Sequence, residues 1–405
     1  MELVTPEALG LDSGQLARVG EHMRRNYIDA GKIPGSVTLV ARHGQACWLD
    51  VAGQSDLERG TPMAADTIFR IYSMSKPVTS VALMTLYERG LFSLEDPVHR
   101  FIPSWRNLGV RKAGAFPLFE TVPCARPMTI RDLLRHTSGL TYDFLRETNI
   151  DYAYRKLQVA NPQPGYTLKH MIDQLAELPL EFSPGECWNY SVATDVLGYL
   201  IEVISGQSLP DYLNEAIFEP LGMVDTAFNI DPDKVDRLAS CYERNAAKQL
   251  VCNDDGQGSM FRDREFYSGG GGLLSTVSDY YRFCQMLLQG GTLDGQRIIG
   301  SRTLEYMTQN HLPGNVDLSA IAMGSFSETD YEGVGFGLGF ATKVDPIANG
   351  NLASHGTFFW GGLASTLFWV DPAEELVVIF MTQLMPSSTF NFRGQLESMI
   401  YAALD

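Results

Sequence analysis

Hydrophobic patterns of two kinds divide this 405-residue chain, and their order along it constrains the fold more than any other feature. Stretches with the spacing of β-strands lie towards both ends, at 36–53, 335–344, 364–371 and 375–383. The first of these reads as a hairpin that turns at His43 and Gly44. Helical spacing fills the middle, at 129–136, 167–178, 191–206, 208–218 and 278–291.

Two further helices are expected, one capped by Asp12 or Ser13 and one from about Asn391 to Ala403. Strands at both ends that are joined by hairpin-length turns favour an antiparallel sheet. We therefore predict an α/β (α+β) fold, in which residues 1–70 and 291–405 form one discontinuous domain with a helix-flanked antiparallel sheet. An all-helical region is predicted to be inserted between the two ends, within a mainly helical domain of residues 71–290, and a cleft between the two domains is the natural place for a site.

The charge balance argues against some classes of partner. Asp and Glu number 48 against 31 Lys and Arg, which gives a net charge of −17. Nucleic acids and anionic membrane surfaces are bound through Lys and Arg, so neither is expected as a partner. No stretch approaches the roughly 18 apolar residues of a spanning helix, and the first residues lack the basic start of a secretory signal. A cytoplasmic location is the expectation.

Cysteine and histidine spacing gives no sign of a metal or of a disulfide framework. The six cysteines are scattered without a CxxC pair, and we expect reduced thiols. The histidines show no HExxH or paired spacing, so neither a metal nor a cofactor is expected. The glycine-rich stretch 268–275 lacks a phosphate-binding pattern and is interpreted as a tight loop before a helix that Ser278 caps.

Ser73 and Lys76 stand three residues apart at the start of an apolar helix. Residues at this spacing share a helix face, so the hydroxyl and the amine can meet. A serine becomes nucleophilic when a base lies beside it, and burial lowers the pKa of a lysine towards that role. Free N–H groups at the helix start can help to hold an oxyanion. On spacing alone, a capping serine and a surface lysine remain an alternative, but the following apolar run suggests that Lys76 is enclosed.

Four segments occur together in the order of a known family: 69–77 (FRIYSMSKP), 182–206, 268–283 and 355–372. They resemble the serine β-lactamase and penicillin-binding-protein fold over nearly the whole chain. The closest resemblance is to the family VIII carboxylesterases, which are similar to class C β-lactamases. The acyltransferase branch related to lovastatin biosynthesis is also similar. The G-x-S-x-G elbow of α/β-hydrolases is absent from the sequence.

The resemblance implies site residues. Ser73 matches the family nucleophile, Lys76 its partner and Tyr190 the tyrosine of the second motif, where Val192 replaces the asparagine of β-lactamases. The third motif, Lys-Thr-Gly in β-lactamases, falls at Trp360, Gly361 and Gly362. The backbone N–H of Leu363 is implied to complete an oxyanion hole with that of Ser73. Tyr142 matches a pocket tyrosine of some members, and His136 and His355 lie inside family-like motifs, where each is expected to make a supporting hydrogen bond.

The set makes chemical sense. An ammonium beside Tyr190 favours its phenolate, so Lys76 and Tyr190 would share one proton and titrate as a pair. Either could take the Ser73 proton, and which is the formal base stays open. The two glycines would let substrate approach the strand backbone closely. Trp360 is expected to form a wall of the pocket against which an ester can pack, with an ordinary core position as the alternative. It offers apolar surface and one N–H but no positive charge, which favours uncharged esters over carboxylate-bearing β-lactams and peptides.

We therefore expect a metal-free serine carboxylesterase that hydrolyses short-chain esters through a Ser73 acyl-enzyme, with little β-lactamase activity. An acyltransferase, in which an alcohol takes the acyl group, is the first alternative, and a β-lactamase or D-amino-acid peptidase is another. A non-catalytic binding module of the same fold is disfavoured by the intact Ser73, Lys76 and Tyr190. The natural substrate and the oligomeric state stay open.

Overall fold

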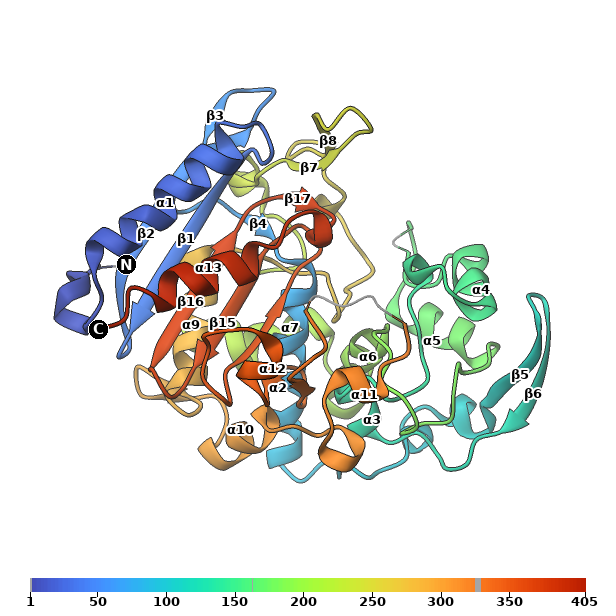
Figure 1. Ribbon diagram of the computed structural model, residues 1–405. Helices are drawn as coiled ribbons and strands as arrows, with labels where there is room; N and C mark the ends of the chain where they lie inside the picture. Colours follow the sequence, from blue (N-terminus) through green and yellow to red (C-terminus); the bar gives the residue numbers. More distant parts are fainter. Residues whose placement is uncertain (1, 162, 325–328) are drawn as a thin grey trace.

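Both ends of the chain build one antiparallel sheet in the computed structural model, which describes residues 2–161, 163–324 and 329–405 (Figure 1). Within these ranges eight strands lie in the order β12-β13-β14-β15-β16-β1-β2-β3. The N-terminal strand β1 pairs with the C-terminal β16, with Val40 opposite Val378. The strands are β1 (Gly35–Arg42), β2 (Gln45–Asp56), β3 (Thr61–Pro62), β12 (Val334–Phe336), β13 (Ala341–Lys343), β14 (Phe358–Gly361), β15 (Leu367–Asp371) and β16 (Leu376–Met381). The predicted sheet is confirmed.

Turn residues decide where these strands begin and end. The β1–β2 hairpin turns at His43 and Gly44 as predicted, and both residues have positive φ, as a two-residue hairpin turn requires. The stretch 335–344 forms two short strands, β12 and β13, in place of one. It turns at Gly339, whose φ of 98° suits glycine and whose missing side chain leaves room for Ser80.

Helices cover both faces of the sheet, which explains why β15 and β16 are buried along their whole length. Helices α1 (Ser13–Met23) and α13 (Phe392–Tyr401) lie in front of the sheet in Figure 1, and α9 (Val277–Leu288) lies behind it. Asp12 caps α1, one of the two residues expected to do so. The cap of α9 is Thr276 and not Ser278, because the Thr276 hydroxyl accepts the Asp279 N–H.

The middle of the chain is mainly helical, with α2 and α6 packed together at its centre. Its helices are α2 (Ser75–Glu88), α3 (Ile130–Leu134), α4 (Asn149–Leu157), α5 (Leu168–Ala176), α6 (Ala193–Ser205), α7 (Leu209–Leu213) and α8 (Glu219–Leu221). Three more helices follow α9, namely α10 (Ser301–Thr308), α11 (Leu318–Ile321) and α12 (Pro346–Asn349).

Short strand pairs interrupt the helical region, so it is not all-helical. They are β4 (Phe69–Arg70) with β9 (Leu274–Ser275), β5 (Gly109–Ala115) with β6 (Leu118–Pro123), and β7 (Cys241–Arg244) with β8 (Leu250–Asp254) and β17 (Leu384–Met385). A further pair, β10 (Thr292–Leu293) with β11 (Gln296–Arg297), follows α9. The β5–β6 hairpin is largely exposed, and its sequence lacks the apolar alternation that would have revealed it. The domain boundaries at 70 and 291 stay a prediction, although α9 covers the sheet from before residue 291.

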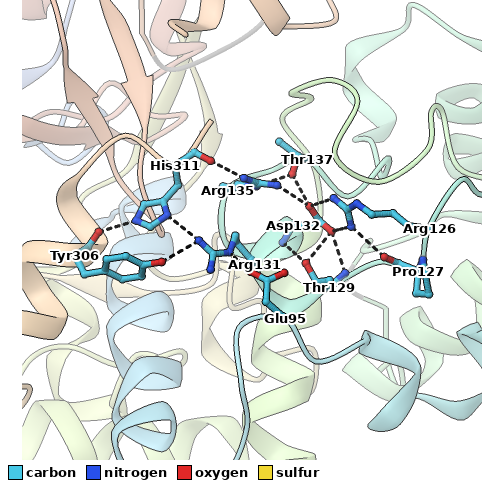
Figure 2. A network of polar contacts seen from close by, with 10 residues as sticks. All are labelled: Glu95, Arg126, Pro127, Thr129, Arg131, Asp132, Arg135, Thr137, Tyr306 and His311. Carbon is cyan, nitrogen blue, oxygen red and sulfur yellow. Dashed lines mark hydrogen bonds and ion pairs between the residues drawn. The ribbon is translucent and has the colours of Figure 1, made fainter. Parts of the chain in front are cut away.

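A polar network anchors α3, the helix that precedes the loop towards the pocket (Figure 2). Buried Asp132 accepts from Arg126 at 2.6 and 2.8 Å and from Arg135 at 3.1 Å. Burial alone would raise the pKa of Asp132, but its hydrogen bonds hold that pKa below the ordinary value. Arg131 continues the network to the Tyr306 hydroxyl, so α3 is tied to α10.

Three further features were considered from the sequence: membrane-spanning helices, disulfide bonds and metal sites. In the described part of the chain, no helix has the length and apolar character needed to cross a bilayer. The six cysteines, all within it, form no disulfide. The same residues contain no group of three or more His, Cys, Asp or Glu side chains placed to hold a metal ion.

Candidate active site

Ser73 lies on a sharp turn between the sheet region and α2. Strand β4 leads into a 3-10 turn, Tyr72–Met74, and α2 begins at Ser75. Tyr72 has a φ of 41°, which side-chain-bearing residues rarely adopt, and such strain is often found at functional turns. Figure 1 shows that α2 crosses the region between the sheet and the helices. The turn that carries Ser73 therefore leads directly into the helix that crosses between these two regions.

Lys76 and Tyr190 converge on Ser73 as the sequence predicted. The Tyr190 hydroxyl donates to Ser73 Oγ at 2.6 Å, and Lys76 Nζ lies 3.3 Å from the same atom. The Lys76 ammonium also lies 4.6 Å from the centre of the Tyr190 ring. Lys76 is 2% exposed, which matches the enclosed position expected from the apolar run after it. Two buried groups that can exchange a proton thus meet one hydroxyl that lines a pocket.

The glycine-rich loop orients Lys76. Lys76 Nζ donates to the carbonyl of Gly270 at 2.7 Å, and Thr79 donates to that of Gly269 at 2.8 Å. A side chain at Gly269 would meet the Thr194 carbonyl at 2.7 Å, so glycine lets this loop pass between α2 and α6. The interpretation of 268–275 as a tight loop before α9 agrees with this structure.

Asp195 completes this arrangement, and sequence reasoning missed it. Its Oδ1 accepts from the Gly270 N–H at 3.1 Å and from the Ser268 hydroxyl, so it helps to fix the residue whose carbonyl holds Lys76. Burial raises the pKa of Asp195, while the charge of Lys76 and the hydrogen bonds act against that rise. The available signal was a carboxylate in the first turn of an otherwise apolar helix, α6.

Two backbone N–H groups are free to bind an oxyanion. Ser73 and Leu363 both line the pocket, and no hydrogen bond within the described part of the chain uses either N–H. The turn that carries Leu363 is held against the nucleophile turn, where Thr366 Oγ1 lies 3.4 Å from the Ile71 carbonyl. An oxyanion hole requires two donors aimed at one point beside the nucleophile, and the assignment of these two N–H groups to that role stays a prediction.

The glycines of the third motif make close contacts within the protein. A side chain at Gly362 would collide with the Ile71 carbonyl and with Thr366, so this glycine allows two protein segments to approach each other. Gly361 is buried and faces another hollow, lined with residues such as Ser365 and Phe392. Neither glycine lines the pocket beside Ser73. Their direct approach to substrate stays a prediction.

Trp360 is also placed differently from the expectation that it forms a wall of the pocket. Its side chain is 0% exposed and does not line the pocket. Its ring packs 5.5 Å from that of Tyr190 and 5.3 Å from that of Phe336. Because β14 lies inside the sheet under these aromatic rings, Trp360 supports Tyr190 from behind and cannot contact a substrate in this structure.

The pocket next to Ser73 has a volume of about 170 Å³. Its lining is mainly aromatic and small: Tyr72, Ser73, Tyr142, Phe144, Ala160, Asp195, Arg264, Phe266, Ser268, Gly270, Gly271 and Leu363. Tyr142 lines it as predicted, with its ring 5.1 Å from that of Tyr190 and stacked on Phe144. A larger hollow of about 550 Å³ beside β5 and β6 is lined by Cys124 and Arg126, but it lies away from Ser73.

His136 and His355, the two histidines in the family-like motifs, differ in burial and in hydrogen bonding. His136 is fully buried, packs 5.2 Å from the Tyr190 ring and lies 3.2 Å from the Ser191 hydroxyl through Nδ1. Burial, with a further effect of the Lys76 charge, lowers the pKa of His136 well below its ordinary value, so it is neutral. His355 is exposed in the turn before β14 and makes no hydrogen bond within the described residues, contrary to the expectation.

Comparison with known proteins decides the family. The Beta-lactamase family matches residues 21–397. The chain belongs to this family. It is 30% identical over 398 residues to Esterase EstB of Burkholderia gladioli, with 93% of both chains covered. It is 29% identical over 385 residues to Monacolin J acid methylbutanoyltransferase of Aspergillus terreus, with 89% of both covered.

A solved structure agrees with these relatives. EstCE1, described as a hydrolase with promiscuous acyltransferase activity, superimposes with a TM-score of 0.79 at 28% identity. The match covers 96% of this chain and 98% of that one. Together these likenesses confirm the β-lactamase and penicillin-binding-protein fold and the resemblance to family VIII esterases. The chain is a serine hydrolase.

Proposed function

We propose that this hydrolase is a carboxylesterase that cleaves short-chain carboxylic esters through an acyl-enzyme on Ser73. The observation that carries the proposal is the meeting of Tyr190 at 2.6 Å and Lys76 at 3.3 Å on one buried hydroxyl beside the pocket. The likeness to Esterase EstB supports ester hydrolysis over other reactions of the family.

In the acylation step the Lys76 ammonium stabilises a phenolate at Tyr190, which takes the Ser73 proton as Oγ attacks the ester carbonyl. The new C–O bond gives a tetrahedral oxyanion, which the N–H groups of Ser73 and Leu363 bind. When the intermediate collapses, the leaving alkoxide takes the proton back from the Tyr190 and Lys76 pair and departs as the alcohol. The acyl group stays on Ser73.

Water ends the cycle by the same proton route. Tyr190 takes a proton from the attacking water, the second tetrahedral intermediate forms, and its collapse returns the proton to Ser73 Oγ. The carboxylic acid leaves. The Gly270 carbonyl, fixed by Asp195, keeps Lys76 in place during both halves of the reaction.

Pocket size and the residues of the second and third motifs favour small esters over β-lactams and peptides. A volume of about 170 Å³ is below the 300 Å³ or more that drug-sized ligands occupy. The third motif has buried Trp360 in place of a lysine, and Val192 is apolar where β-lactamases have asparagine. A β-lactam would therefore meet neither the space nor these polar partners.

An acyltransferase is the second candidate, because relatives of the chain transfer acyl groups. The two functions share the acyl-enzyme and differ in whether water or an alcohol resolves it. One experiment tests both proposals: kcat/KM for p-nitrophenyl butyrate is compared with that for nitrocefin and for a D-Ala-D-Ala peptide, with and without added alcohols. Efficient ester hydrolysis with weak turnover of the other two is expected. Equal efficiency on nitrocefin or the peptide would overturn the esterase proposal, and dominant transfer to the alcohol would favour the acyltransferase.

A further inference from the structure

The pocket beside Ser73 contains a cationic side chain that the acylation mechanism does not use. Arg264 lines this pocket together with Ser73 and Leu363. It comes from the loop after the 3-10 turn Met260–Arg262, far in sequence from the family motifs that supply the proposed catalytic groups. From the sequence we expected no positive charge in the pocket, because only position 360 was considered. Arg264 comes from a different segment and supplies that charge.

Arg264 makes no ion pair in the part of the chain that the structure describes, although the charge of Asp254 acts on it from a greater distance. Its Nε is buried without a hydrogen-bond acceptor, and its Nη2 lies 3.1 Å from the sulfur of Met260, a weak acceptor. The nearby buried Arg70 is different, since it bonds Asp254 at 2.6 Å and the Ser259 hydroxyl at 3.0 Å. The Arg70 guanidinium is thus fully hydrogen-bonded, whereas the Arg264 guanidinium, which faces the pocket, keeps N–H donors without an acceptor among the described residues.

The Arg264 guanidinium is held in a fixed position. Its Cζ lies 3.6 Å from the centre of the Phe261 ring, and its backbone is clamped by Asn229, which accepts at 2.9 Å and donates at 3.1 Å. A stacked guanidinium keeps the N–H groups in its plane available for a carboxylate. Burial lowers the pKa of Arg264 to about 10, so it remains a cation at neutral pH.

The one carboxylate that the structure describes in the pocket lining does not pair with Arg264. Asp195 accepts from Ser268 and Gly270 and interacts with the charge of Lys76. Arg264 is the one cation among the described residues of this lining. A small anion that enters the pocket therefore meets a guanidinium that no carboxylate of the lining occupies.

We propose that Arg264 binds a carboxylate of the substrate, so that the pocket prefers short esters that carry a carboxylate over neutral esters of the same shape. Half-esters of dicarboxylic acids carry it on the acyl side, and esters of small hydroxy acids carry it on the alcohol side. The inference rests on the proposed esterase function and adds the substrate class. Planar recognition by two N–H groups is the contact that Arg makes with carboxylates better than Lys does.

Two matched pairs of esters test this inference. Monoethyl glutarate is compared with ethyl 5-methylhexanoate, and butyryloxyacetate with isobutyl butyrate, since each pair exchanges a carboxylate for an isopropyl group. The ratio of kcat/KM within each pair is measured by pH-stat titration for the wild type, Arg264→Gln, Arg264→Lys and Arg262→Gln. Arg262 is the matched control, because it is exposed in the same loop, carries the same charge and does not line the pocket.

In at least one pair the charged ester should be preferred about 10-fold or more by the wild type. Arg264→Gln should remove that preference, Arg264→Lys should keep part of it, and Arg262→Gln should keep all of it. The pair that responds shows which side of the ester carries the carboxylate. Equal kcat/KM within both pairs for the wild type, or a ratio that Arg264→Gln leaves unchanged, would overturn the proposal. If the Gln variant is unfolded by circular dichroism, the Lys variant decides by the same ratios.

Binding of glutarate, measured by calorimetry, separates this inference from the proposed function. Glutarate should bind the wild type and Ser73→Ala alike, and about 10-fold or more weakly to Arg264→Gln. If glutarate binds in this way but no ester is hydrolysed, the anion site is supported and the proposed esterase function is refuted. If esters are hydrolysed but neither glutarate binding nor the rate depends on Arg264, the esterase function is supported and the anion site is refuted.

Discussion

Deletion of one hydroxyl, in Tyr190→Phe, separates the role of Tyr190 in proton transfer from its role in packing. The removed atom is the donor that meets Ser73 Oγ at 2.6 Å. The ring, which is 1% exposed, keeps its contacts with His136, Trp188 and Trp360. The cost to folding is therefore that of one buried hydrogen bond, about 0.5–1.5 kcal/mol.

The cost to the reaction should be much larger. A positioned proton-transfer group contributes about 10²- to 10⁴-fold to a rate, which corresponds to about 3–5.5 kcal/mol of activation free energy. We therefore expect kcat for p-nitrophenyl butyrate to fall about 100-fold or more, while the free energy of unfolding in urea falls by about 1 kcal/mol. If the activation free energy rises by much more than the free energy of unfolding falls, the lost hydroxyl acts in the transition state and not only in folding.

Tyr154→Phe supplies the control. Tyr154 is equally buried, lies on α4 and does not line the pocket. It should lose stability like Tyr190→Phe and keep the wild-type rate. A fully folded Tyr190→Phe enzyme whose kcat falls less than about 10-fold, or no more than that of Tyr154→Phe, would refute the proton-transfer role.

Three further predictions follow from the same structure. Lys76→Met and Tyr190→Phe should each remove most of the rate, and the double variant should be little worse than either, because groups that act as a unit are strongly non-additive; multiplicative losses would show that they act independently. Burial raises the pKa of Glu181 from 4.5 to about 7, so the folded state holds a proton that the unfolded state releases, and stability should fall as pH rises between those values. Glu181→Gln should remove this slope and raise the free energy of unfolding above pH 7 by up to about 3 kcal/mol, as measured by urea unfolding at pH 4.5 and pH 8; an unchanged slope would contradict the assignment. Prolonged dialysis against a chelator should leave ester hydrolysis unchanged, and a loss that zinc or manganese restores would contradict a metal-free reaction.

Local sequence patterns predicted the parts of the site that sit in short motifs. Ser73 and Lys76 share a helix start, and Tyr190 lies in a segment whose order along the chain matches the family, so their meeting could be expected. The hairpin at His43 and Gly44 was predictable for a similar reason, because two turn residues fix it.

The remaining parts depend on contacts between distant segments. Asp195 meets the active site because the loop at Gly270 passes beside the start of α6, and Arg264 reaches the pocket from a loop whose backbone Asn229 holds. Trp360 was expected at the pocket wall, but the pairing of β14 inside the sheet and the rings of Tyr190 and Phe336 bury it. Periodicity and motif spacing carry no information on such distances.

Labelling with a fluorophosphonate, followed by intact-protein mass spectrometry and peptide mapping, tests the central claim most directly. The account predicts one adduct per chain, located on Ser73, and a parallel loss of esterase activity. Ser73→Ala should take up no label while remaining folded. An adduct that maps to another serine, or labelling that persists in Ser73→Ala together with esterase activity, would contradict the assignment of Ser73 as the nucleophile.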